Sequence, residues 1–143
     1  MGGGEPYQKI ADVTVEETVY QLEQDIGFSA KELVIFFYTP TMTEGVSSMK
    51  MYSQTGFCFF QDNSWGDANR EKYYRIEVDT TNWLEWHQYE SNSNAIMAPT
   101  TSSIAEQYNV TFPTESPIAD INKLKFAAAK GILQNSRIII YAR

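Results

Sequence analysis

The chain has 143 residues, of which 43% are hydrophobic and 20% charged, and this composition fits a single globular domain. Its formal net charge of -7 would repel a phosphate backbone, so we expect no nucleic acid partner. Its longest apolar runs, Leu33 to Tyr38 and Ile138 to Ala142, are far shorter than the ~20 residues that cross a bilayer, so we expect a chain that is not membrane-spanning, soluble or peripheral to a membrane complex.

Residues 1–12 are predicted to form an N-terminal tail and residues 13–143 a single domain. The chain has one cysteine, Cys58, which cannot form an intramolecular disulfide, so an intracellular, reducing compartment is expected. The first residues have neither the apolar region of a secretory signal nor the arginines of a mitochondrial presequence, so no targeting signal is recognised.

Helix and strand are expected to alternate in the first part of the domain. Thr14 and Glu17 form a capping box, and apolar residues then recur at helical spacing as far as Ile26, which predicts a first helix. The run Leu33 to Tyr38 is continuously apolar and predicts a strand that is buried on both faces. A second helix is expected over residues 43–56.

The second part of the chain predicts two further strands. Residues Gln61 to Lys72 are polar and indicate a loop, and Tyr73 to Val78 has the alternation of a strand. The content of Lys, Ala and Leu favours a helix over Lys123 to Leu133, and the chain ends with an apolar strand over Arg137 to Ala142. A helix over residues 83–89 would gather Trp83, Trp86 and Tyr89 into one aromatic stripe, and a short helix is expected over residues 103–113.

Three short motifs, in this order and spacing, resemble the thioredoxin-like family. They are Phe37-Tyr38-Thr39-Pro40, Ile76-Glu77-Val78-Asp79 and residues 104–114, which end in Pro113-Thr114. In that family the first motif enters the active loop, the second is the next parallel strand and the third leads to a cis-proline, so Pro113 is the candidate cis-proline. The resemblance implies an α/β fold, with a central mixed sheet flanked by helices, long loop insertions and a modified C-terminal third.

The expected active-site loop is degenerate. The family places two cysteines, two residues apart, after the aromatic-x-Pro motif. After Pro40 this chain has Met42, Thr43, Glu44 and Gly45, and none of these side chains exchanges disulfides. The resemblance therefore implies a redox-inactive domain.

Other candidate chemistry is disfavoured. Phenylalanines surround Cys58 in the sequence, and apolar surroundings raise a thiol pKa, so a packed cysteine is favoured over a reactive one. His87 is the only histidine, which makes a zinc site improbable. The segment Asp62 to Tyr73 has the oxygen density of a calcium loop, but its glycine and its twelfth residue do not match one. We expect no catalytic residue, metal or cofactor.

The aromatic content, 14%, is high for a chain of this size, and aromatic side chains often anchor protein interfaces. The candidate interface residues are Trp65, Trp83, Trp86, Tyr89 and Arg143. The sequence is therefore interpreted as a non-catalytic, thioredoxin-like structural or accessory subunit of a larger protein assembly, whose partners are other protein subunits. A mitochondrial complex is the specific case that the resemblance favours.

Two alternatives stay open. One is a single-cysteine enzyme that uses Cys58 in glutathione or peroxide chemistry. The other is a peptide-binding module that keeps the family's groove beside Pro113 without its cysteines.

Overall fold

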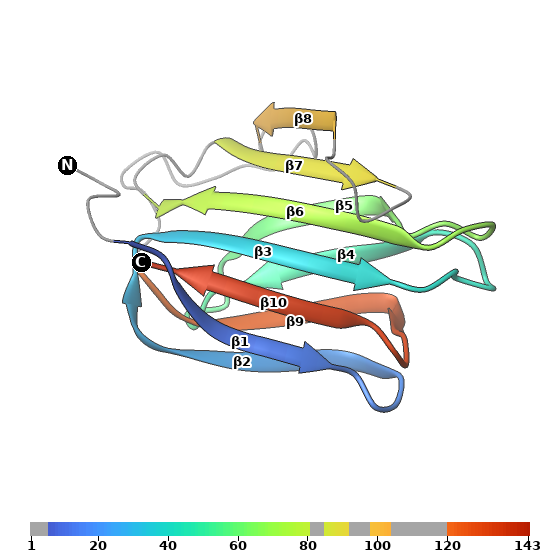
Figure 1. Cartoon of the computed structure of the whole chain (residues 1–143), viewed down its shortest axis with the longest axis horizontal. Helices are drawn as coiled ribbons and strands as arrows, with labels where there is room; N and C mark the ends of the chain where they lie inside the picture. Colours follow the sequence, from blue (N-terminus) through green and yellow to red (C-terminus); the bar gives the residue numbers. More distant parts are fainter. Residues whose placement is uncertain (1–5, 81–84, 92–97, 104–119) are drawn as a thin grey trace.

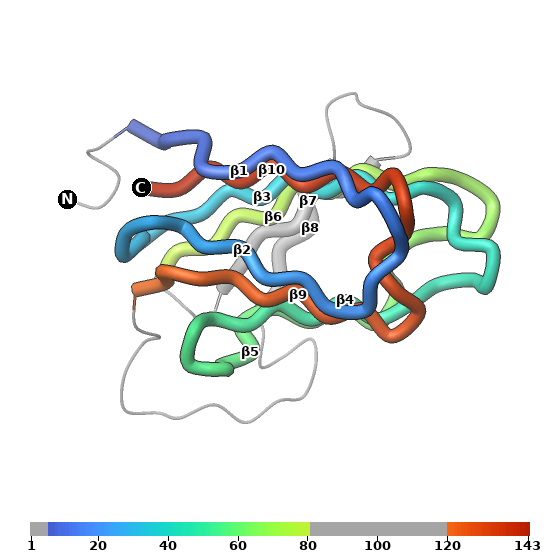
Figure 2. The backbone as a smooth tube through the Cα atoms, turned by 90° about the horizontal axis from the view of Figure 1, so that it is seen from below, coloured from blue at the N-terminus to red at the C-terminus, as the bar shows by residue number. Residues whose placement is uncertain are grey.

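The computed structural model describes residues 6–80, 85–91, 98–103 and 120–143, with the backbone alone described for the two middle ranges. Within these ranges the chain forms ten β-strands and no α-helix. The strands make two antiparallel sheets that lie face to face as two layers (Figure 1). The separation of the layers is clearest when the molecule is seen from below (Figure 2).

The first sheet has six strands in the order β1-β10-β3-β6-β7-β8, and each neighbouring pair is antiparallel. Its strands are β1 (Gln8–Thr14), β10 (Arg137–Ala142), β3 (Glu32–Thr39), β6 (Lys72–Asp79), β7 (Glu85–Ser91) and β8 (Ala98–Ser103). The last strand of the chain thus lies inside the sheet, between β1 and β3. A sheet ordered in this way can form only when the two ends of the chain come together.

The second sheet has four strands in the order β2-β9-β4-β5, again antiparallel. Its strands are β2 (Val19–Ala30), β9 (Ile121–Ile132), β4 (Ser47–Tyr52) and β5 (Cys58–Trp65). The two four-stranded layers β1-β10-β3-β6 and β2-β9-β4-β5 have the architecture of a jelly roll, and β7 and β8 extend the first layer beyond β6.

The core lies between the sheets and follows the two-residue period of the strands. Alternate residues of β3 and β10 point inward, and alternate residues of β4 and β9 meet them from the opposite sheet. The buried side chains of these four strands include Leu33, Ile35, Phe37, Ile138, Ile140, Met49, Met51, Leu124 and Phe126. The Trp65 ring closes one region of the core by stacking on Tyr74, with ring centroids 3.8 Å apart and planes 12° from parallel.

The expected α/β fold is wrong. An antiparallel sandwich has neither the central mixed sheet nor the flanking helices that the resemblance to the thioredoxin-like family implies. Leu33 to Tyr38 and Tyr73 to Val78 do lie side by side, but they are antiparallel, with Leu33 opposite Val78. An antiparallel pair needs no crossover helix, so the central feature of the prediction is lost. The expectation of a mitochondrial subunit was based on the same resemblance, so the fold gives it no support.

The helices predicted over residues 14–26, 43–56 and 123–133 are strands β2, β4 and β9. Leu22 and Ile26 are four residues apart, a spacing that places them on one side of a strand as well as of a helix. In β9, Leu124 and Phe126 are buried and Lys125 between them is not, which is a period of two. Cross-strand packing has overridden the helix propensity of Lys and Ala there.

Other boundaries also differ. The terminal strand over Arg137 to Ala142 is confirmed as β10, within the chain's own sheet. β1 begins at Gln8, inside the segment predicted to be a tail, and β5 occupies the first part of the predicted 61–72 loop. Residues 85–89 of the predicted aromatic helix belong to β7, and the helix predicted over 103–113 lies, apart from Ser103 in β8, outside the described residues.

Candidate functional site

The outer face of the six-stranded sheet is rich in half-buried aromatic and aliphatic side chains. They alternate with the core residues of β3, β6 and β10, so they point away from the core. The strand register places them in adjoining rows: Tyr38 is opposite Tyr73, and Phe36 is opposite Ile139. We call this surface the aromatic face, made of Val34, Phe36, Tyr38, Tyr73, Ile139 and Tyr141.

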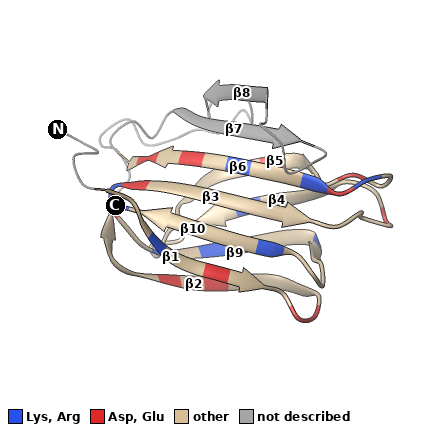
Figure 3. Cartoon of the chain, in the orientation of Figure 1, with Lys and Arg blue, Asp and Glu red and all other residues tan. Residues whose placement is uncertain are grey.

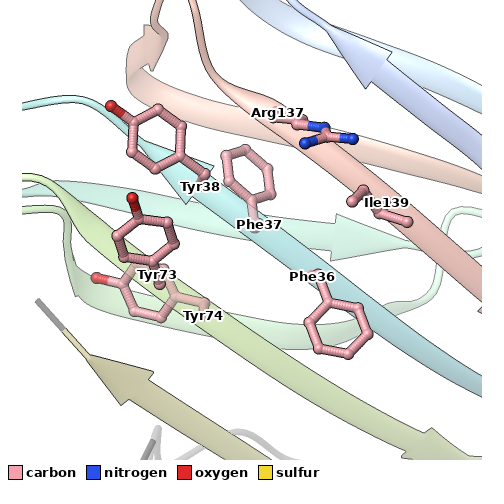
Figure 4. A pocket seen from close by; sticks show the side chains of 7 residues that line it. All are labelled: Phe36, Phe37, Tyr38, Tyr73, Tyr74, Arg137 and Ile139. Carbon is pink, nitrogen blue, oxygen red and sulfur yellow. The ribbon is translucent and has the colours of Figure 1, made fainter. Parts of the chain in front are cut away.

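A hollow of about 360 Å³ lies at one end of the aromatic face. Its lining comes from three neighbouring strands, β3, β6 and β10 (Figure 4). The rings of Tyr38 and Tyr73 are in contact, with centroids 5.0 Å apart and planes tilted by 45°. The lining residues are Phe36, Phe37, Tyr38, Tyr73, Tyr74, Arg137 and Ile139. An aromatic hollow with a few polar groups at its rim is the usual form of a small-ligand site.

A carboxylate beside the hollow holds one of its tyrosines. The Tyr38 hydroxyl donates a hydrogen bond to Oε2 of Glu71 at 2.7 Å. This hydrogen bond, with a smaller contribution from burial, raises the pKa of Tyr38 to about 12. Burial, followed by the charge of Glu71, also raises the pKa of Tyr73. Both phenols are therefore protonated at neutral pH, and the proton of Tyr38 is already donated to Glu71.

Ion pairs hold the charges around the aromatic face. Arg137 donates two hydrogen bonds to Asp12, Nε to Oδ1 at 2.9 Å and Nη2 to Oδ2 at 2.8 Å. The hydrogen bond from Arg137 lowers the pKa of Asp12 to about 2, and Lys9 lies 3.4 Å from the same carboxylate. At the other end of β10, Arg143 binds Glu32 at 2.7 Å. The face thus combines apolar rings with charges that already have opposite partners.

The outer face of the four-stranded sheet has a different composition. Its outward-facing residues include Gln21, Glu23, Asp25, Lys50, Tyr52, Gln61, Lys123 and Lys125, which we call the polar face. Lys123 forms ion pairs with both Glu23 and Asp25. Figure 3 shows acidic and basic residues along β2 and β9, whereas most of β3 is uncharged. The outer face of the six-stranded sheet also carries charges, such as the Arg75–Glu77 ion pair on β6, but its outward residues on β3 and β10 are mostly apolar, whereas those of β2 are mostly polar.

The loop that was predicted to be a degenerate active site joins β3 to β4 across the two sheets. Within it, Met42 is buried and packs against Gly66. The carbonyl oxygen of Glu44 accepts a hydrogen bond from Nζ of Lys130 at 2.7 Å. Pro40 follows the last residue of β3, and Thr43 and Gly45 lie in the connection to β4. Pro113 lies outside the described residues.

The predicted interface residues are dispersed. Trp65 is only 2% exposed and belongs to the core, so its ring is not offered to a partner. Arg143 binds Glu32 and lies over the ring of Tyr7, 4.0 Å from its centroid. Trp86 and Tyr89 lie on β7, where only the backbone is described, and Trp83 lies outside the described residues.

The remaining sequence candidates, Cys58 and Asp62, lie in β5 and have local hydrogen bonds. Cys58 is half-buried, its thiol donates to the Phe60 carbonyl at 3.3 Å, and burial raises its pKa. Asp62 is almost buried and accepts a hydrogen bond from the amide of Ser64, as in an Asx turn. Among the described residues no group of three or more His, Cys, Asp or Glu side chains could hold a metal ion. Those residues also include no helix of the length and hydropathy that a bilayer crossing requires.

Sequence reasoning missed the residues that make the aromatic face. The signal was present in the uninterrupted apolar runs of β3 and β10, of which the first was interpreted as buried on both faces and the second only as an apolar strand. In a sandwich only one face of such a strand meets the core, so the second set of apolar residues is left at the surface.

Neither the models of known protein families nor the curated proteins match this chain. The fold does not select a function either, because jelly rolls occur in capsid proteins, lectin domains and cupins.

Proposed function

We propose that this protein is a non-catalytic accessory subunit of a larger assembly, and that it holds its partner through the aromatic face. The observation that carries the proposal is the contrast between the two outer surfaces of the sandwich. One outer surface has the aromatic face and the other has the polar face, although the inner surfaces of the two sheets pack on the same core. Contiguous apolar surface with a polar rim is typical of a binding surface.

The charges support the same role. Asp12 with Arg137 and Glu32 with Arg143 form ion pairs beside the aromatic face, so a partner that covers the rings does not leave those charges without an opposite charge. The likeness to capsid and lectin domains is an analogy of architecture and by itself assigns no function. The thiol-enzyme alternative is disfavoured, because Cys58 is partly buried with a raised pKa, and reactive thiols have lowered ones.

The test compares side-chain labelling of the isolated chain with labelling in the complex purified from its source. Hydroxyl-radical oxidation should modify Tyr38, Tyr73 and Tyr141 less in the complex than in the isolated chain. Tyr20, which is 63% exposed on β2, is the internal control and should be labelled equally in both. Equal labelling of the four tyrosines in both samples, or a native mass of a lone 16.3 kDa chain, would contradict the proposal.

A pair of variants gives a second test. Phe36→Glu places a charge in the middle of the aromatic face, and Lys50→Glu places the same residue on the central strand β4 of the polar face. Phe36→Glu should prevent incorporation into the complex, whereas Lys50→Glu should be incorporated normally. Near-ultraviolet circular dichroism of both variants checks that the packing of the core is intact. Normal incorporation of folded Phe36→Glu would exclude the aromatic face as the contact.

A further inference from the structure

The hollow at the end of the aromatic face restricts the chemistry of what can bind there. Most of its lining is aromatic or aliphatic: the Tyr38 and Tyr73 rings are in contact, with centroids 5.0 Å apart, and Phe36 and Ile139 line it from neighbouring strands (Figure 4). Aromatic rings of this kind bind apolar C–H surface and flat molecules. The ligand therefore needs at least one apolar side.

A charged ligand is disfavoured at this site. An anion would have to compete with Asp12 for the Arg137 guanidinium, which already makes two hydrogen bonds to that carboxylate. A quaternary ammonium group needs rings around it, and the Tyr38 and Tyr73 rings touch one another, which leaves no space between them. Arg137 also lines the hollow and would repel a cation.

The polar groups at the rim include both donors and acceptors. Arg137 has N–H groups beyond the two that bind Asp12, and the carboxylates of Asp12 and Glu71 can each accept further hydrogen bonds. A hydroxyl group donates one hydrogen bond and accepts others, so it can use both kinds of partner. Several hydroxyls around a ring with apolar C–H faces match the rim and the floor together.

We propose that the hollow binds a neutral oligosaccharide, with a sugar ring against Tyr38 and Tyr73 and its hydroxyls bonded by Arg137 and Glu71. This inference rests on the proposed function, because it names the chemistry that the aromatic face would recognise on its partner. The volume of the site suits one or two sugar rings, since about 360 Å³ is at the lower end of the range for small-ligand pockets.

The experiment titrates the isolated, ¹⁵N-labelled chain with four soluble neutral oligosaccharides: cellohexaose, xylohexaose, maltohexaose and chitohexaose. At least one should shift the backbone amides of residues 36–38, 73–75 and 137–139 while the amides of the polar face stay in place. Tyr73→Ala should weaken that binding about tenfold or more, since it removes a ring contact. Tyr52→Ala, the matched change on the polar face, should bind as the unmodified chain does.

Each other outcome decides against the inference. No shift with any of the four sugars would overturn it, as would unchanged binding by Tyr73→Ala. If Tyr73→Ala does not fold, Tyr73→Leu keeps the apolar volume, and it should still lose binding. Tighter binding of hexagalacturonate would show that the ligand is an anion, and a mass above 16.3 kDa by light scattering, reduced by Phe36→Glu, would show that a second copy occupies the face. Failure with sugars while the tyrosines are protected in the native complex refutes the oligosaccharide alone and leaves the proposed function standing.

Discussion

Gly66, directly after β5, has a backbone conformation and a surrounding space that other residues do not tolerate. Its φ is 81°, its N–H donates to the Tyr74 hydroxyl at 2.8 Å, and a Cβ atom there would overlap Sδ of Met42. Gly27 has a φ of 93° but nothing within 4 Å of the corresponding position. A substitution at either glycine is therefore destabilised by the left-handed backbone conformation. Only a substitution at Gly66 is also destabilised by a steric overlap.

We predict that Gly66→Ala lowers the free energy of unfolding by about 2–4 kcal/mol and Gly27→Ala by about 1–2 kcal/mol. The left-handed backbone accounts for the loss at Gly27, and displacement of the buried Met42 adds to it at Gly66. Urea denaturation of the two variants measures both values. Equal losses at the two positions would show that Met42 moves aside without cost.

The ion pair between Asp12 and Arg137 predicts a pH dependence of stability. The pKa of Asp12 is lowered to about 2 in the folded chain, below its value of about 4 in the unfolded chain. The pair's contribution is therefore complete above pH of about 4 and is lost as the pH falls towards about 2. The free energy of unfolding should fall more steeply over this window for the unmodified chain than for Asp12→Asn.

Arg137→Gln provides the control for this measurement, because it removes the donor of the pair and keeps the carboxylate. It should flatten the acid limb of the stability curve as Asp12→Asn does, and the double variant should add little to either. If the stability of all three variants fell with pH as steeply as that of the unmodified chain, the pair would not lower the pKa of Asp12.

At the scale of single elements, β10 shows how one strand serves both the core and the surface. Ile140 is fully buried between the sheets, and Ile139 faces outward and lines the hollow. β10 pairs with β1 on one side and β3 on the other, so its register decides which isoleucine enters the core.

We predict that Ile140→Ala lowers the free energy of unfolding by about 2–5 kcal/mol, because it opens a cavity in the core. Ile139→Ala, the same change one residue away, should cost only about 1 kcal/mol, because its side chain is partly in water already. Thermal and urea denaturation of the pair give both values. A larger loss for Ile139→Ala would reverse the assigned register of the strand.

At the scale of the whole molecule, the sheets join segments that are far apart in the chain. β1 pairs with β10, and β2 pairs with β9. The first two strands therefore cannot form their native hydrogen bonds until the last two strands have reached them. Long-range antiparallel pairing requires large loops to close before native contacts form, and this slows folding.

We therefore predict that the chain refolds in milliseconds to seconds, as expected for a β-sandwich of high contact order. Stopped-flow fluorescence, with buried Trp65 among the reporters, measures the rate. Interrupted-unfolding experiments separate this phase from slower proline isomerisation. A main phase in microseconds would show that local structure dominates the folding barrier.

The sequence alone determined the positions of the two strands that have continuous apolar runs. The apolar runs at Leu33 to Tyr38 and Arg137 to Ala142 are both strands, and the strand predicted at Tyr73 to Val78 does neighbour the first. It also excluded thiol exchange at Met42 to Gly45, because no cysteine stands there. These are properties of residue type and local period, which need no partner to be recognised.

The tertiary structure alone decided the fold and the site. Residues four apart, such as Leu22 and Ile26, share one side of a helix or of a strand, and only pairing with β9 selects the strand. Phe36 and Ile139 meet because β3 and β10 pair across about a hundred residues of chain, a contact that no local pattern encodes. For the same reason a continuous apolar run does not reveal whether its second face is covered by helices or, as here, forms an aromatic surface at the outside of a sandwich.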